Sequence, residues 1–306
     1  MNVSLSNSGG GQVFNAITSG CMCFWDASDC VAEALKDDLR ALGAGLEAFA
    51  PKPRTEESAL GMALKDVGQL LVKTGKIAWS KRSRLMTERK AARGDGVELV
   101  KVVKHGSVEN DYEVLLTARV EQGSLRVTHG WLDSSDRLFL LERWESYCQQ
   151  TAGASVGRSL VDIIKCLHGT CVRPVGGVYY LPEGEVALWD QVIGVYEKHG
   201  STVTRAKVVM DDKAARSIKK AVVDELSMEA AELLDDLMRN DIRDETVKRR
   251  LRKAKELRSK CVLYEEVLSD TLAGVHTLLD SVEKSQGITQ AVSDDDALFA
   301  DDSVFA

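Results

Sequence analysis

Residues 224–245 read DELSMEAAELLDDLMRNDIRDE, and residues 248–260 read KRRLRKAKELRSK. The first segment sets nine acids against two arginines, a net charge of −7, and the second sets eight bases against one glutamate, a net charge of +7. Residues 211–284 around them contain no proline and a single glycine, Gly274, so this part of the chain favours long helices. We expect two helices that fold back on each other near residues 240–241 and neutralise each other's charge.

Apolar residues recur with helical spacing on both sides of this reversal. Between Ile218 and Leu237 they are separated by three, four or multiples of these numbers, and from Val247 to Val282 a three-four alternation lasts for about five heptads. A continuous second helix would be roughly 60 Å long at 1.5 Å per residue, so it needs a partner along one face. The sequence therefore predicts a long C-terminal α-helical hairpin or coiled coil over residues 211–286.

Residues 21–210 mix helical and extended patterns and are expected to form an α+β domain. A β-branched run at residues 97–103, an alternating stretch at 112–120 and a third strand near 125–131 predict an antiparallel meander with packed helices. Glycines at 176–177 between β-prone arms predict a hairpin. Helices are expected where apolar residues recur every three or four positions, at residues 29–42, 55–71, 155–167 and 182–196. Residues 138–147 fit either a helix or a strand, and we favour a helix.

The two ends of the chain have compositions typical of disordered segments. Residues 1–20 are rich in glycine and serine, and residues 287–306 hold five aspartates, two phenylalanines and no base. Aspartates can steer such a tail to a basic groove, where an aromatic ring anchors it. The candidate partner-binding residues of the tail are Asp294, Asp295, Asp296, Phe299, Asp301, Asp302 and Phe305.

The overall composition excludes several classes of protein. The chain has 306 residues, of which 44% are hydrophobic and 28% charged, with a net charge of −7 and no apolar run of 18 residues, so we expect a soluble protein without a membrane span. Residues 1–20 lack the charged leader and apolar block of a secretory signal. Seven cysteines without such a signal indicate reduced thiols, and we expect a cytoplasmic location.

Two basic clusters are candidates for phosphate binding, because nucleic-acid affinity comes mainly from clustered lysine and arginine. For residues 248–260 the adjoining acidic segment favours structural pairing over nucleic acid. Residues 73–93 carry eight bases and one acid, and no acidic segment adjoins them. The candidate nucleic-acid-binding residues are Lys73, Lys76, Trp79, Lys81, Arg82, Arg84, Arg89, Lys90 and Arg93.

The sequence carries no convincing catalytic signature. Residues 153–157 match the letters of the G-x-S-x-G nucleophile elbow of hydrolases, but no strand pattern precedes Ser155, which we expect to cap a helix instead. We therefore assign no catalytic residue, no enzyme activity and no cofactor. We also predict no metal, although the sequence alone does not decide whether six residues outside the usual Cys-x2-Cys spacing bind one: Cys21, Cys23, Cys30, Cys166, His168 and Cys171.

Two short segments resemble a known family. Residues 173–182, RPVGGVYYLP, and the turn at residues 51–54, which is followed by apolar pairs at 59–60 and 63–64, are similar to a family of uncharacterised proteins from phages, plasmids and other mobile elements. The resemblance covers roughly residues 25–210. It implies an origin in a mobile element and no particular activity.

These observations favour a non-enzymatic interaction or assembly protein of a phage or mobile element. Its helical region would associate with a protein partner or with further copies of the chain as a homo-oligomer, and its acidic tail would dock on a partner. The alternative is a nucleic-acid-binding protein that uses the basic residues 73–93. Neither function needs a cofactor or a membrane.

Overall fold

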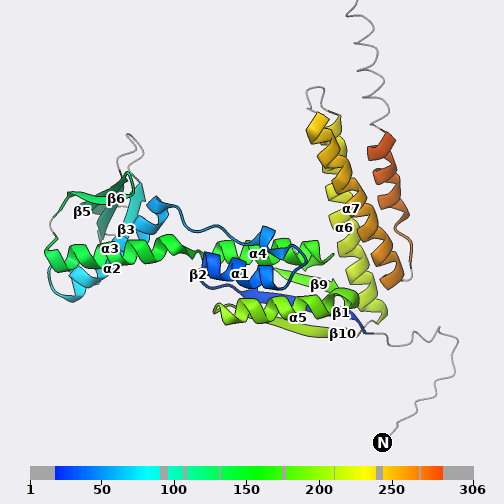
Figure 1. The fold of residues 1–306 in the computed structure, drawn as a ribbon, viewed down its shortest axis with the longest axis horizontal. Coiled ribbons are helices and arrows are strands. Elements are labelled where there is room, and N and C mark those ends of the chain that lie inside the picture. Colours follow the sequence, from blue (N-terminus) through cyan, green and yellow to red (C-terminus); the bar gives the residue numbers. More distant parts are fainter. Residues whose placement is uncertain are drawn as a thin grey trace, which may run out of the picture. The chain divides into compact units, whose positions relative to one another are not determined.

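The chain divides into two compact units, whose elements are shown in Figure 1. The sheet unit comprises Asp26–Ile163 and Gln191–Thr202, and the helical unit comprises Met1–Trp25, Ile164–Asp190 and Val203–Ala306. The computed structural model describes residues 18–89, 96–105, 109–130, 132–173, 177–209, 211–238, 244–268 and 270–284.

The sheet unit is built on a four-stranded antiparallel meander in the order β3-β4-β5-β6. The meander expected after residue 97 is confirmed, and one further strand, β3, precedes it. β3 escapes sequence analysis because its large apolar residues, Leu85 and Met86, are adjacent rather than alternating. The strands are β3 (Ser83–Arg89), β4 (Val97–His105), β5 (Glu109–Glu121) and β6 (Ser124–His129).

Helices α2 (Glu56–Lys73) and α3 (Ser134–Gln149) pack against each other, and α2 lies on one face of this sheet. α2 begins where the sequence predicts, because the Thr55 hydroxyl oxygen accepts the Ser58 N–H at 3.3 Å. Gly68 lets the sheet approach the helix closely: a Cβ at this position would lie 2.8 Å from side-chain carbons of one leucine in β3 and one in β4. The remaining elements of this unit before α4 are β2 (Cys30–Val31), α1 (Ala32–Ala41), the 3-10 helix η1 (Leu46–Phe49) and β7 (Gln150–Thr151).

Helix α4 (Gly153–Cys166) starts earlier than the sequence predicts. The Gly153 N–H donates to the Asp29 carboxylate at 2.7 Å, so a side chain 124 residues away caps the helix, and the expectation that Ser155 is the N-cap is wrong. Gly153 itself meets a packing constraint. A Cβ there would lie 2.4 Å from the carbonyl oxygen of Ala27.

The helical unit contains a second sheet, in the order β10-β1-β9-β8. β9 pairs antiparallel with β1 and with β8, which confirms the hairpin expected around residues 176–177. The sequence does not predict β1, since its first residues fall in the glycine-rich N-terminal segment. The strands and the helix that follows β9 are β1 (Thr18–Asp26), β8 (Thr170–Arg173), β9 (Val178–Pro182), β10 (Thr202–Val209) and α5 (Glu183–Lys198).

Three helical segments follow β10 and share one apolar core: α6 (Asp212–Leu237), α7 (Asp244–Leu268) and residues 273–284. The expectation of one continuous helix from Val247 to Val282 is wrong, because α7 ends at Leu268. The Glu265 side chain accepts the Leu272 N–H at 2.6 Å, just before the third segment begins.

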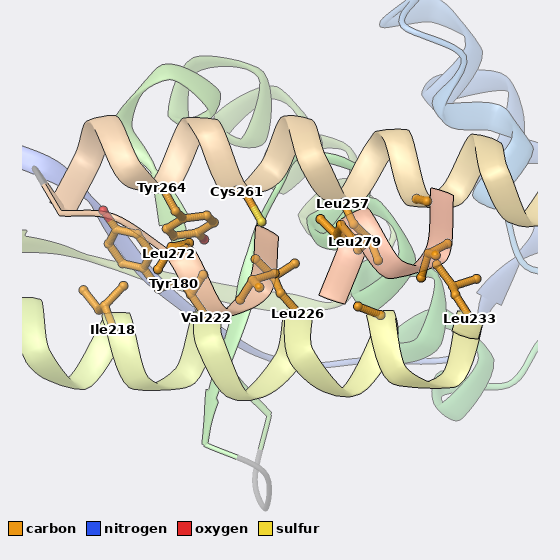
Figure 2. Close-up of a cluster of buried hydrophobic side chains, with 14 of the residues drawn as sticks. Tyr180, Ile218, Val222, Leu226, Leu233, Leu257, Cys261, Tyr264, Leu272 and Leu279 are labelled. Atoms are coloured by element: carbon orange, nitrogen blue, oxygen red, sulfur yellow. The ribbon is translucent and has the colours of Figure 1, made fainter. Parts of the chain in front are cut away.

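A three-four apolar repeat cannot distinguish one long helix from two helices that both face a common core. Figure 2 shows this common core: leucines of α6 and α7, together with Cys261 of α7, pack with Leu272 and Leu279, which follow α7 in the chain. The structure therefore has three helical segments around one core in place of the expected two-helix hairpin.

We expect Gly153→Ala to lower the free energy of unfolding by about 1–3 kcal/mol, because the added methyl overlaps a backbone carbonyl that cannot easily move. The matched control is Gly194→Ala in α5, where a Cβ meets nothing within 4 Å and the better helix propensity of alanine should add about 0.5–1 kcal/mol. Urea unfolding followed by circular dichroism measures both changes. Equal effects of the two substitutions would contradict the packing role of Gly153.

Candidate functional site

Opposite charges join α6 and α7 along their length, as the sequence predicts. The residue numbers of the partners fall along α6 as they rise along α7, so the two helices run antiparallel. In the described part of the chain, the closest nitrogen–oxygen distances of these ion pairs are 3.1 Å for Lys260–Glu225, 3.0 Å for Lys253–Glu229 and 2.5 Å for Arg250–Asp236.

One of these pairs is buried and ties both helices to β8. Lys260 is 7% exposed, and its Nζ donates to Glu225 Oε1 at 3.1 Å and to the Gly169 carbonyl oxygen at 2.8 Å. The other carboxylate oxygen of Glu225 accepts the Cys171 N–H at 3.1 Å. Burial lowers the pKa of Lys260, and the adjacent Glu225 opposes that shift. The four groups form a clamp between α6, α7 and the start of β8.

Tyr264, one turn further along α7, extends this clamp. Its hydroxyl donates to the His168 carbonyl oxygen at 2.9 Å, and its ring lies 6.1 Å from the ring of Tyr180 in β9. His168 has a φ of +59°, a left-handed conformation that a non-glycine residue rarely adopts. The clamp therefore holds the turn between α4 and β8 in a specific shape.

Arg258 connects α7 to the third helical segment. Its guanidinium lies 2.7 Å from the carboxylate of Asp280 and 3.1 Å from that of Glu283. The hydrogen bond from Arg258 lowers the pKa of Asp280. Because residues 280–283 lie beside residue 258, this segment runs back along α7.

Four bases of α7 face away from these partners: Lys248, Arg249, Arg252 and Lys255, here called the α7 basic stripe. All four side chains are exposed, and no ion pair involves them within the described ranges. Glu245 and Glu256 are also exposed on this helix. The expectation that structural pairing uses up the basic segment is therefore only half right, since a helix that packs one face against a partner leaves the other face in solvent.

A corresponding surface of opposite charge runs along α6. Asp224, Met228, Glu232, Asp235 and Met238, here called the α6 outer stripe, follow one another at spacings of four or three residues and are all exposed. The two methionines are 59% and 70% exposed, which is unusual for large apolar side chains. The α6 outer stripe thus combines acids with adaptable apolar side chains.

The basic segment 73–93 is only partly available for binding. Lys76 donates to the carboxylates of Asp133 at 2.6 Å and Asp136 at 2.8 Å, and these hydrogen bonds raise the pKa of Lys76. It therefore links the end of α2 to the start of α3. Five other candidates are exposed, at the end of α2, on the loop that follows it and on β3: Lys73, Trp79, Lys81, Arg82 and Arg84.

Several predicted site residues lie outside the part of the chain that the structure describes. Lys90 and Arg93 fall in such a gap, and of Arg89 only the backbone is described. The candidate tail residues between Asp294 and Phe305 also lie beyond the described residues.

The cysteine and histidine candidates for metal binding do not converge. Cys21 and Cys23 lie on one face of β1 with their sulfurs 3.5 Å apart, and both are buried. Within the described ranges, no group of three or more histidine, cysteine or acidic side chains is placed to hold a metal ion. Burial raises the pKa of Cys30 and of Cys261 to about 11.

A pocket of about 270 Å³ surrounds Ser155, which sequence analysis considered as a nucleophile. Its other lining residues include Arg158, Ser159 and Asp162, and the Ser159 hydroxyl oxygen lies 2.6 Å from that of Tyr196. Ser155 lies within the first turn of α4 rather than on an exposed elbow between a strand and a helix. No histidine lines the pocket among the described residues.

The buried Lys260, the α7 basic stripe and the α6 outer stripe are not among the residues predicted from the sequence. The sequence pattern could have indicated that Lys260 is buried, because this residue directly precedes the core residue Cys261 and therefore lies beside the buried face of α7. The helical period also gives the residues of the α7 basic stripe and the α6 outer stripe, but only after the structure shows which face of each helix is packed.

The comparisons with known proteins assign no activity to these surfaces. The model of a family of unknown function, DUF6744, matches residues 20–294. No curated protein and no solved structure matches the chain. No helix in the described part of the chain is long and apolar enough to cross a membrane.

We expect Lys260→Met to lower the free energy of unfolding by about 3–5 kcal/mol, because it leaves the carboxylate of Glu225 buried without its cation. The control is Lys253→Met, which breaks a pair whose lysine side chain is half exposed and should cost about 1 kcal/mol or less. In a double-mutant cycle, Lys260→Met with Glu225→Leu should lose less stability than the sum of the single changes. Additive losses in urea unfolding would show that the clamp does not act as a unit.

Thiol labelling should follow the burial of the cysteines, since only an accessible thiolate reacts. Under native conditions we expect Cys166, which is exposed, and Cys171 to react with iodoacetamide before Cys21, Cys23 and Cys261. Peptide mass spectrometry gives the order, and the unfolded chain, in which all cysteines should react, is the control. Early labelling of Cys21 or Cys23 would show that β1 opens readily.

Proposed function

The chain belongs to the DUF6744 family, whose function is unknown, and we propose that it is a non-enzymatic assembly protein that associates through the exposed faces of α6 and α7. The observation that supports this proposal is the pair of oppositely charged stripes on the two helices. Fixed surfaces of opposite sign, beside a core that is already filled, are suited to binding rather than to folding.

A second copy of the chain is the partner that fits both stripes at once. The α7 basic stripe of one copy can face the α6 outer stripe of the other, and a two-fold axis then repeats the same contact. Met228 and Met238 would supply apolar contact area between the charges, since methionine adapts to irregular surfaces. Electrostatic attraction would set the partner and the register, and the methionines would add affinity.

The proposal includes three features that the sequence suggests. The acidic segment 287–306 would dock on a basic groove of a protein partner. The protein would originate from a phage or another mobile element, as the resemblance of residues 173–182 implies. A cytoplasmic location is supported by the cysteines, all of which are free thiols.

We expect the wild-type chain to self-associate at about 50 mM salt and to dissociate at about 500 mM salt, because salt screens exposed charges. Arg249→Glu with Arg252→Glu should abolish association, and so should Asp224→Lys with Glu232→Lys. An equimolar mixture of these two double variants should associate again, since their stripes become complementary to each other. Sedimentation velocity measures each state.

The matched control is Lys52→Glu with Lys104→Glu, which reverses two exposed bases of the sheet unit and should leave association unchanged. Two results would contradict the proposal. One is a wild-type chain that stays monomeric at low salt, and the other is a mixture of the two stripe variants that fails to associate.

A further inference from the structure

The two faces of the β3–β6 sheet have different chemistry. On one face, here called the inner face, the sheet packs against α2 and α3 through the side chains of Val97, Leu99, Leu116 and Ala118. Because neighbouring residues of a strand point to opposite faces, Val100 and Val102 of β4 lie on the other, outer face. A bulge shifts the pairing of β4 with β5 after Leu99, so Val114 and Tyr112, which lie opposite these valines, belong to the outer face too. Among the described helices, α2 makes the extensive contacts with this sheet, and it does so on the inner face.

An exposed aromatic ring, that of Tyr112, lies on the outer face near one end of the sheet. The strand register places Arg84, Val102 and Tyr112 side by side across β3, β4 and β5. Val102 is fully buried, whereas Tyr112 is 60% exposed. The next row of the register is Met86, Val100 and Val114, in which Val100 is also buried. The Tyr112 side chain is therefore much more exposed than the valines of β4 beside it.

Cations border this ring at one end of the sheet. The Lys104 N–H donates to the Arg82 carbonyl oxygen at 3.3 Å, which places these two residues next to each other at the row beyond Arg84. The side chains of Lys81, Arg82, Arg84 and Lys104 are all exposed, and in the described part of the chain none of them forms an ion pair. Trp79, 43% exposed, lies in the loop that leads into β3.

We propose that the outer face of the β3–β6 sheet binds single-stranded nucleic acid. The Tyr112 ring offers a stacking surface for an unpaired base, and Arg84, Arg82 and Lys104 lie within a few strand spacings of it to contact the adjoining phosphates. Stacking on an exposed ring of a sheet surface requires bases that are free to turn outward, so a double helix is a poor ligand. Trp79 is a further exposed ring, in the loop that enters β3 at this end of the sheet.

This binding site is independent of the proposed assembly, because its residues belong to the sheet unit and the two stripes belong to the helical unit. It also differs from the site that the sequence suggests. Of the basic residues in segment 73–93, Lys76 is already bound to two carboxylates, whereas Tyr112 and Lys104 come from other strands.

The test is fluorescence anisotropy of the full chain with labelled oligothymidylate of about 20 nucleotides. We expect binding that weakens by more than about tenfold between 50 mM and 200 mM salt. Tyr112→Ala should weaken binding by roughly 5- to 150-fold, whereas Tyr112→Phe should keep it, because stacking needs only the ring. Arg84→Ala should lower the salt slope by about 0.7, the value for one lost contact to a single strand.

Two control variants test whether binding is specific to this face of the sheet. Phe24→Ala removes an exposed aromatic side chain on β1, and Arg249→Glu with Arg252→Glu reverses the α7 basic stripe; both should leave binding unchanged. Circular dichroism checks that each variant is folded. The proposal is overturned if oligothymidylate does not bind, if Tyr112→Ala and Arg84→Ala bind like the wild type, or if duplex DNA of equal length binds more tightly.

Discussion

The buried pair of Lys260 and Glu225 fixes the arrangement of the helical unit. Taking either charge out of water is costly, so each must keep its partner, and the pair must also keep its bonds to Gly169 and Cys171. The observed arrangement satisfies all of these groups. It sets α7 against α6 in a single register and holds both helices against the start of β8. The apolar core alone specifies this register less strongly, because its residues recur every three or four positions along both helices.

This packing of α7 against α6 divides the charged side chains of the two helices into those that are paired and those that face solvent. Bases that face α6 or the third helical segment are paired, and their net contribution to stability is modest except where both partners are buried. The four bases of the α7 basic stripe have no such structural use in the described part of the chain. Solvated charges of this kind contribute more to the choice and orientation of a partner than to the stability of the fold.

The sheet unit shows a similar division between an inner and an outer surface. Its inner face is closed by apolar contact, in which Gly68 removes the side chain that would otherwise keep α2 away from the sheet. Its outer face combines the exposed ring of Tyr112 with the flanking cations Arg84 and Lys104. In each unit, buried side chains define the fold, and exposed charged and large apolar side chains are suited to binding. The proposed assembly uses the helical unit, and the proposed nucleic-acid contacts use the sheet unit.

Several local elements follow from the amino-acid sequence alone: the Thr55 cap, the meander after Val97, the hairpin before Pro182 and the charge pairing of α6 with α7. These depend on neighbouring residues or on a periodic pattern, which sequence carries directly. The cap of Gly153 by Asp29, the end of α7 at Leu268 and the burial of Lys260 emerge only from the three-dimensional packing. Each of these depends on a group distant in the chain or on which face of an element is covered, and a periodic pattern contains neither.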